Sequence, residues 1–306
     1  MSIPPSGRQY EIRYGEQVAV VVEVGGGVRQ YRVADRAVLD PYPREAMCDG
    51  AHGTVLVPWP NRLAQGRYRF DGVDYQVAVT EPEKDNAIHG FARWRNWEPV
   101  SRGSNQVTMG IRLYPQMGYP FLLEVTVNYL LDDEGLTVMT TATNRGEQAC
   151  PYGCGHHPYL SPGSGLIDQA LLSFTAGTRI ITDPDRQLPT GTEPVTGGSF
   201  DFSPGRQLGG QRIDYAFTDL ARDGDGDGRA WVRLDGTDGR RAELWVDDTY
   251  PLIELYTGDT LSPHRRRQGL GVEPMTCPPN AFQSGDGVHR IEPGHTVTAR
   301  WGARLR

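Results

Sequence analysis

The sequence predicts an almost all-β protein built as one large antiparallel sandwich or barrel. Runs of β-branched and aromatic residues recur at short spacing along the 306-residue chain, and many are separated by glycine-rich or Asp-Gly turns. No stretch keeps apolar residues at the i, i+3, i+4, i+7 spacing of a helix together with capping residues. Many short strands and few helices favour an antiparallel fold over an alternating α/β sheet.

Two hairpins are the clearest predicted elements. Residues 17–33 predict an opening hairpin around a triple-glycine turn. Residues 66–77 predict a second one, in which Asp71-Gly72 suits a type I′ turn. The other expected strands lie at residues 122–130, 136–143, 229–234, 241–246, 252–257 and 296–301.

The chain is long enough for one large domain or two small ones. With 38% hydrophobic residues it can bury a large core. No linker is long or polar enough to divide it. We therefore expect a single domain over residues 1–306.

Net charge and hydropathy argue against several classes of partner. Lys and Arg number 31 against 38 Asp and Glu, a net charge of −7, and the basic residues are scattered, so neither a nucleic acid nor an anionic membrane is expected. No apolar run approaches the roughly 20 residues that span a bilayer, and residues 1–5 lack the features of a signal peptide. We expect a soluble, cytoplasmic protein with its four cysteines reduced.

Residues 221–228 form an expected surface loop. The alternating pattern of Asp223, Asp225 and Asp227 with glycines is similar to the opening of a calcium-binding loop. The twelfth position is Leu234, which has no carboxylate where such a loop needs a bidentate Glu. A solvated turn is therefore the preferred interpretation.

Four short clusters place ionisable groups among apolar or turn-forming residues. Taken alone, each has a structural explanation: a surface ion pair for Arg62, a structural histidine for His89, and a solvent-facing strand end for Glu273. Adjacent side chains of a strand point to opposite faces, so we expect only one of His156 and His157 in any one site. The clusters are residues 58–62, 86–91, 153–160 and 271–275.

Spacing gives little support to three other kinds of site. The ligands of a candidate zinc set would diverge along a strand, and the set lacks a Cys-x-x-Cys knuckle. No Gly-x-Ser-x-Gly elbow precedes a helix, which argues against a Ser–His–Asp triad. The glycines at 25–27 lie between strands and do not open a helix, so they do not predict a phosphate cradle. The zinc set considered is Cys150, Cys154, His156 and His157.

Taken together, the clusters form an ordered series of motifs. The chain reads PWPNRLAQGRYRFDGVDYQ, then IHGF, HPY, DYAF and VEPMTCPPNAF. From roughly residue 15 to the end, this series resembles the aldose 1-epimerases, or galactose mutarotase-like proteins, and the PWPNR and HPY spellings resemble a bacterial subgroup of that family. Many family members have Asn-His-Ser-Tyr-Phe where this chain has residues 156–160, and a His where it has Tyr215, so the resemblance leaves the sugar open.

The resemblance implies an all-β fold, a large antiparallel β-supersandwich, and a set of site residues. It assigns the catalytic acid to His157 and the catalytic base to Glu273, which leaves a structural role for His156. It implies no metal and no organic cofactor. The residues that it assigns to substrate binding are Arg62, His89 and Asp214.

Mutarotation needs an acid and a base at one carbon atom. Opening the hemiacetal requires a base for the proton of the C1 hydroxyl and an acid for the ring oxygen, and closure reverses the roles. An imidazole titrates near neutrality, and a carboxylate with a raised pKa suits the second role. We expect His157 and Glu273 to face each other from opposite sides of a sugar-sized pocket, with the reacting oxygens between them.

The predicted protein is an isomerase, an aldose 1-epimerase (mutarotase) that interconverts the α and β anomers of a free aldohexose such as glucose or galactose. One alternative is a 1-epimerase of an anionic sugar, a hexose 6-phosphate or a sulfonated hexose, to which the arginines at 265–267 would supply cations. Another is a sugar-binding module without turnover, which would lack the acid or the base. The expected partner is a monosaccharide, and the protein is expected to be a monomer or a homodimer.

Overall fold

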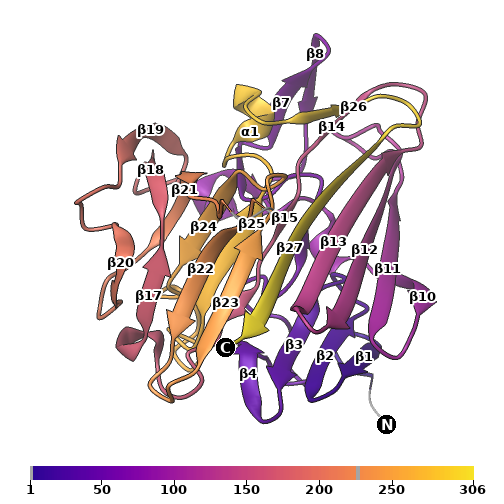
Figure 1. The fold of residues 1–306 in the computed structure, drawn as a ribbon. Helices are drawn as coiled ribbons and strands as arrows, with labels where there is room; N and C mark the ends of the chain where they lie inside the picture. The colour runs from indigo at the N-terminus through magenta and orange to yellow at the C-terminus, as the bar shows by residue number, and fades with distance from the viewer. Residues whose placement is uncertain (1–2, 225–227) are drawn as a thin grey trace.

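Two large antiparallel sheets make up most of the molecule, which the computed structural model describes over residues 3–224 and 228–306 (Figure 1). Within these residues one sheet has twelve strands and the other has nine. The predicted all-β antiparallel fold is therefore confirmed.

The twelve-stranded sheet combines the N-terminal strands with strands from the second half of the chain. In sheet order its strands are β1 (Gln9–Tyr14), β2 (Gln17–Val22), β3 (Val28–Val33), β4 (Arg36–Leu39), β16 (Tyr159–Leu160), β25 (Leu270–Met275), β24 (Leu252–Tyr256), β21 (Asp214–Leu220), β18 (Ala176–Thr182) and β19 (Pro189–Pro194), with β15 (Gly155–His156) and β5 (Val55–Leu56) off this path.

The nine-stranded sheet lies in front of the first in Figure 1, and its central strand leads to the C-terminus of the chain. In sheet order its strands are β10 (Glu98–Arg102), β11 (Gln106–Leu113), β12 (Leu123–Asp132), β13 (Gly135–Asn144), β27 (Thr296–Leu305), β23 (Arg241–Val246), β22 (Ala230–Asp235), β17 (Leu171–Phe174) and β20 (Phe202–Gln207).

Shorter strands and helices lie outside the two large sheets. Three two-stranded ribbons pair β14 (Cys150–Tyr152) with β26 (His289–Ile291), β6 (Arg62–Ala64) with β9 (Asn86–Ile88), and β7 (Arg67–Phe70) with β8 (Val73–Gln76). The helical elements are η1 (Pro82–Lys84), η2 (Ala92–Trp94), η3 (Ile167–Gln169) and α1 (Ala281–Ser284). None of the helices described here has the length and apolar composition needed to cross a membrane.

The core lies between the two sheets, because each sheet turns one apolar face inward. On β12 every second residue is buried, as expected for a strand with one face in the core. Tyr31 from the first sheet and Tyr129 from the second belong to the same buried cluster. Burial of such large rings stabilises this interface.

The predicted hairpins are confirmed, and several strands were missed, among them β25, which carries Glu273, and β21, which carries Asp214. β2 pairs with β3, and β7 pairs with β8 through Asp71 and Gly72, which both have the positive φ of a type I′ turn. β25 was not among the expected strands, because Pro274 interrupts its run of strand-forming residues. Part of the predicted loop and calcium-like pattern, residues 225–227, lies outside the described residues.

Candidate active site

Three neighbouring strands present carboxyl groups on one face of the twelve-stranded sheet, two of them buried and that of Asp214 partly exposed. Glu273 on β25 lies directly opposite Glu254 on β24, and Asp214 on β21 lies opposite Tyr256, two residues further along β24. Because side chains alternate between the faces of a strand, the three carboxyl groups share one face. Val272, next to Glu273, enters the core on the other face. Glu273 and Glu254 are only 2% and 4% exposed, so the predicted solvent-facing alternative for Glu273 is wrong.

The sheet register brings His157 against Glu273. β25 pairs Tyr159 with Gly271 and Gly155 with Met275, so the intervening His157 falls opposite Glu273. Their Nε2 and Oε1 atoms are 3.1 Å apart. Our expectation that the two groups would face each other from opposite sides of a sugar-sized pocket is therefore wrong, because they are in direct contact.

His157 is held by an aromatic ring and by backbone contacts. Its imidazole stacks on the ring of Tyr159, with centroids 5.0 Å apart and an interplanar angle of 18°. The Tyr159 hydroxyl in turn donates to the carbonyl of Gly50 at 2.8 Å. The His157 amide donates to the Thr54 carbonyl at 3.2 Å. These contacts fix the ring, so Nε2 is aimed at the carboxyl group before any ligand arrives.

His156 points away from this site, as strand alternation predicts. Its Nε2 lies 2.7 Å from the Thr140 hydroxyl on β13 of the other sheet. Its ring lies 5.4 Å from that of Trp301. The side chain therefore lies in the core between the two sheets, on the opposite face of the strand from His157.

Asn61, to which the sequence assigned no role, joins three parts of the site. Its backbone amide donates to His89 Nδ1 at 3.2 Å, and its side-chain amide donates to Glu254 Oε2 at 2.6 Å. Its Oδ1 accepts the amide of Arg62 at 2.8 Å. Asn61 and His89 both have the positive φ that is uncommon outside glycine and clusters at functional sites. The only sequence signal for Asn61 was its place inside PWPNR.

Gly90 is required at its position for steric reasons. It has φ +64°, and a Cβ there would lie 2.0 Å from the Val57 carbonyl oxygen. The chain can therefore bring His89 to the site only with glycine next to it. This gives the IHGF motif a structural reason.

Arg62 lies beside the acidic row but is bound by another carboxylate. Its guanidinium makes two hydrogen bonds to Glu81, at 2.9 and 3.0 Å. The charges of Glu81, Asp214 and Glu254 raise the pKa of Arg62 against the effect of its burial. The structure thus brings all five predicted site residues to one region, and it adds Asn61, Glu81 and Glu254 to them.

Burial determines the protonation of the central groups. Burial lowers the pKa of His157 to about 3. Burial and the charges of Glu254 and Asp214 raise the pKa of Glu273 well above its usual range. Both shifts favour uncharged forms. A neutral imidazole therefore lies beside a carboxyl group that retains its proton to higher pH than usual.

His89, His157 and Glu273 have ligand atoms within 4.8 Å of one another, as a metal site would require. His89, however, accepts the Asn61 amide at Nδ1. A neutral imidazole that accepts at Nδ1 carries its proton on Nε2, so that nitrogen has no lone pair for a metal. The tautomer fits a hydrogen-bond donor to a ligand better than it fits a metal ligand.

The arginines at 265–267 are occupied by neighbouring groups. Arg265 lies 2.7 Å from Asp40, and Arg267 lies 2.6 Å from Asp168 and 3.1 Å from Asp259. The Nε of Arg266 donates to a backbone carbonyl, that of Leu261. None of these contacts involves Glu273, so the observation on which the anionic-sugar alternative depended is not supported.

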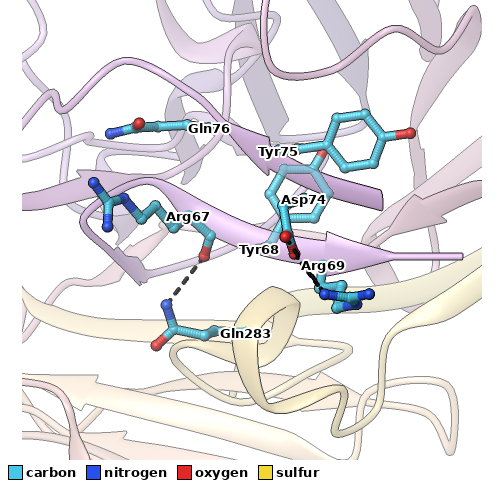
Figure 2. Close-up of a pocket in the computed structure, with 7 residues that line it drawn as sticks. All are labelled: Arg67, Tyr68, Arg69, Asp74, Tyr75, Gln76 and Gln283. Atoms are coloured by element: carbon cyan, nitrogen blue, oxygen red, sulfur yellow. Dashed lines mark hydrogen bonds and ion pairs between the residues drawn. The ribbon is translucent and has the colours of Figure 1, made fainter. Parts of the chain in front are cut away.

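A surface hollow of about 540 Å³ lies elsewhere, between β7, β8 and α1 (Figure 2). Tyr68 and Tyr75 stack along it, and Gln283 donates to the Arg67 carbonyl at 3.2 Å. Arg69 and Asp74 form an ion pair at its edge. None of the predicted site residues lines this hollow.

Comparison with solved structures identifies the fold. The fold is that of galactose mutarotase-like proteins: the structure superposes on that of a GalM/aldose epimerase homologue from C. elegans with a TM-score of 0.86, at 18% identity, over 98% of both chains. It also superposes on a galactose mutarotase-like protein from Clostridium acetobutylicum with a TM-score of 0.86, at 17% identity, over 100% of this chain and 97% of the other.

The sequence defines the family. The profile described as Aldose 1-epimerase matches residues 8–303, and the chain belongs to the aldose 1-epimerase family, a family of isomerases. It is 34% identical to the uncharacterized protein YihR of Escherichia coli K12 over 290 residues, which cover 94% of this chain and 90% of YihR. It is 25% identical to the aldose 1-epimerase of the same organism over 252 residues, which cover 74% of this chain and 71% of that protein.

Proposed function

We propose that the protein is a mutarotase that interconverts the α and β anomers of a free aldohexose such as glucose or galactose. The observation that carries the proposal is the 3.1 Å contact between His157 Nε2 and Glu273 Oε1 on a buried sheet face. Arg62, His89 and Asp214 surround this pair with groups that hydrogen-bond sugar hydroxyls. The chemistry is acid–base ring opening, with His157 as the acid and Glu273 as the base.

The contact between the two groups fits a hemiacetal. The C1 hydroxyl and the ring oxygen are bonded to the same carbon, so neighbouring acid and base groups can reach both. In the charged tautomer of the pair, in which the proton of Glu273 has moved to His157, His157 donates a proton to the ring oxygen as Glu273 removes the proton of the C1 hydroxyl. The C1–O5 bond breaks, an aldehyde forms, and the pair is left as neutral His157 and protonated Glu273.

Ring closure reverses these transfers after rotation about the C1–C2 bond. Glu273 returns its proton to the carbonyl oxygen, and His157 takes the proton of the C5 hydroxyl. Opening and closure thus interconvert two tautomers of a pair that holds the same number of protons. No proton has to be exchanged with solvent during a cycle, which suits a buried site.

The test is the rate of anomer interconversion. Wild-type protein should accelerate the relaxation of freshly dissolved α-glucose or α-galactose, followed by polarimetry or NMR. His157→Ala and Glu273→Gln should each lose the acceleration, whereas His295→Ala, at an exposed histidine, should keep it. Undiminished activity in either site variant would refute the assigned roles.

A second candidate substrate is a hexose with an anionic substituent, and Arg93 on η2 favours it. Its guanidinium is half-buried and stacks on Trp94 at 5.5 Å, and within residues 3–224 and 228–306 no hydrogen bond or ion pair engages it. Its charge contributes to lowering the pKa of both His89 and His157. A cation beside the site without a carboxylate partner is suited to a phosphate or sulfonate group.

Glucose 6-phosphate and a sulfonated hexose should be compared with glucose as substrates. If the anionic group binds Arg93, Arg93→Gln should raise KM for the anionic sugar by roughly tenfold or more and leave KM for glucose unchanged. Arg95→Gln, at the exposed neighbouring arginine, is the matched control. Equal kinetics of wild type and Arg93→Gln with both sugars would exclude this candidate.

A further inference from the structure

The turn between β18 and β19 lies at the candidate active site and has no part in the proposed mechanism. The β18–β19 hairpin forms one edge of the twelve-stranded sheet and is next to β21 (Figure 1). β18 pairs Arg179 with Phe217 of β21, so at the same register the last residue of β18, Thr182, falls opposite Asp214. The turn that follows, residues 183–188, is therefore beside a predicted sugar-binding residue.

Gln187 in this turn connects Asp214 to Lys84. Its Nε2 donates to Asp214 Oδ2, and its Oε1 accepts from Lys84 Nζ. A side-chain amide donates only through nitrogen and accepts only through oxygen, an ammonium group only donates, and a carboxylate only accepts. Because the cation lies on one side and the carboxylate on the other, a single orientation of the amide satisfies both. The NH₂ group of Gln187 is therefore held toward Asp214.

The backbone of the turn is fixed in the conformation that places Gln187 there. Gln187 has φ 53°, a positive value that is uncommon outside glycine and that clusters at functional sites. The Asp183 carboxylate accepts the amides of Arg186 at 2.6 Å and Leu188 at 2.9 Å. The Gln187 amide donates to the Asp183 carbonyl at 3.0 Å. These hydrogen bonds offset the cost of the unfavourable φ.

The same turn is fastened to η1 and β9, about a hundred residues earlier in the chain. The Arg186 guanidinium donates to the carbonyls of Lys84 at 2.9 Å and Asp85 at 2.7 Å. In return Asn86 Nδ2 donates to the Arg186 carbonyl at 2.9 Å. Gln187 therefore reaches Asp214 from a turn that is held on both sides.

Lys84 links Gln187 to the other charged residue of the predicted sugar site, Arg62. Lys84 Nζ lies 3.3 Å from Glu81 Oε1, and Glu81 accepts two hydrogen bonds from Arg62. Cations and carboxylates alternate along this series, and the neutral amide of Gln187 lies between Lys84 and Asp214. Asp214 thus receives a donor without a direct contact to the cation, and its remaining lone pairs can accept from a ligand.

We propose that Gln187 is a positioning residue of the sugar site: its side-chain amide holds the carboxylate of Asp214 in the orientation in which it accepts a hydrogen bond from a sugar hydroxyl. The inference rests on the proposed function, in which Asp214 binds the sugar. Gln187 acts through Asp214 and need not touch the sugar itself.

The first test does not depend on turnover. In NMR spectra recorded without added sugar, the side-chain amide protons of Gln187, assigned by their loss in Gln187→Glu, should exchange slowly with water. The proton that faces the carboxylate should be shifted downfield. Asp214→Ala should remove this shift, whereas Asp219→Ala, towards the other end of β21, should keep it.

Unchanged amide signals in Asp214→Ala would overturn the inference, even if the protein interconverts anomers. The signals keep their meaning if none of the sugars tried is a substrate, so failure of the inference and failure of the proposed function are distinguishable.

The second test is kinetic and uses glycine to keep the backbone. Gln187→Gly permits the positive φ but removes the amide, so KM for the sugar should rise roughly tenfold, as expected for loss of one hydrogen bond to a charged group, with a smaller change in kcat. Gln65→Gly, at an exposed glutamine that also has positive φ, at 57°, is the matched control and should keep the wild-type KM. A wild-type KM in Gln187→Gly would refute the inference.

Gln187→Glu separates hydrogen-bond donation from packing. The substitution keeps the length of the side chain and an acceptor for Lys84, but it turns a carboxylate toward Asp214 in place of a donor. KM near neutral pH should therefore rise at least as far as in Gln187→Gly. A wild-type KM in Gln187→Glu would show that the side chain only fills space, and would overturn the positioning role.

Discussion

His156 and His157 are adjacent and almost equally buried, and they lie in two different chemical environments. Burial lowers the pKa of each to about 3. His156 meets a hydroxyl and an indole in the core, whereas His157 meets Glu273 in a row of acids. Burial alone therefore does not make a histidine reactive. The difference comes from the groups that the sheet register places opposite each ring.

The largest expected difference between His156 and His157 is in their contribution to kcat. His157→Gln should lower kcat by roughly 10²- to 10⁴-fold, the usual contribution of a general acid. His156→Gln, one residue away, should change kcat only a few-fold, because its ring does not reach the site. Anomer exchange measured by NMR gives both rates, and circular dichroism checks that both variants are folded. Similar losses in the two variants would remove the distinction between the two environments.

A smaller kinetic effect is expected from substitution of Asn61, which connects the region around His157 to the neighbouring acids. Asn61→Gly permits the positive φ of this position but removes the side chain that binds Glu254. We expect kcat/KM to fall roughly tenfold to a hundredfold from loss of that charge-assisted hydrogen bond.

Asn280 supplies the matched control for Asn61. It also has positive φ, at 64°, and its Oδ1 braces the same ribbon by accepting the Ala64 amide at 3.0 Å. Asn280→Gly should lower stability by about 1 kcal/mol while changing kcat/KM much less than Asn61→Gly does. Equal kinetic losses would mean that Asn61 acts only by supporting the backbone.

The burial of His156 should also affect a different property, stability in acid. The pKa of His156 is about 3 in the folded protein and 6.5 without burial, so between these pH values the unfolded chain binds more protons. The free energy of unfolding therefore falls as pH falls through this window, by up to about 1.4 kcal/mol per pH unit for one histidine. Urea unfolding should show a shallower pH slope for His156→Gln than for wild type. An unchanged slope would contradict the pKa assigned to His156.

The carboxyl groups of the site should change the free energy of unfolding with pH in the opposite direction. The pKa values of Glu273 and Glu254 are raised, so above their ordinary pKa of 4.5 the folded protein binds more protons than the unfolded chain. The free energy of unfolding that these groups contribute therefore falls as pH rises. Stability in acid thus reports on the histidines, and stability at higher pH reports on the acids.

The sequence predicted the fold because most strands have one face in the core and one in solvent. Such strands alternate, and the β7–β8 turn has the Asp-Gly pair that its geometry requires. It did not predict β25, whose run of strand-forming residues is interrupted by Pro274. The motifs identified the region of the site, since Arg62, His89, His157, Asp214 and Glu273 converge. The contact between His157 and Glu273 was not predictable, because it depends on the register between β15, β16 and β25.

Glu254 was missed for a related reason. In the run Leu252 to Tyr256 it is the one charged residue among apolar and aromatic residues, and it belongs to none of the motifs that marked the other site residues. Its burial follows from long-range pairing with β25 and from the cover provided by Asn61. Sequence periodicity shows whether apolar and polar residues alternate along a strand, but only the assembled sheet determines which residues cover each face.

The smallest expected effect concerns the hydrogen bond between His156 and Thr140. The single variants Thr140→Val and His156→Leu should each lower the free energy of unfolding, and the double variant should lose less than the sum, by about 1 kcal/mol. Chemical denaturation of the four proteins measures this coupling. His157→Leu should not couple with Thr140→Val, because the His157 ring is on the other face of the strand. Coupling of Thr140 to His157 instead of His156 would show that the two histidines exchange environments in solution.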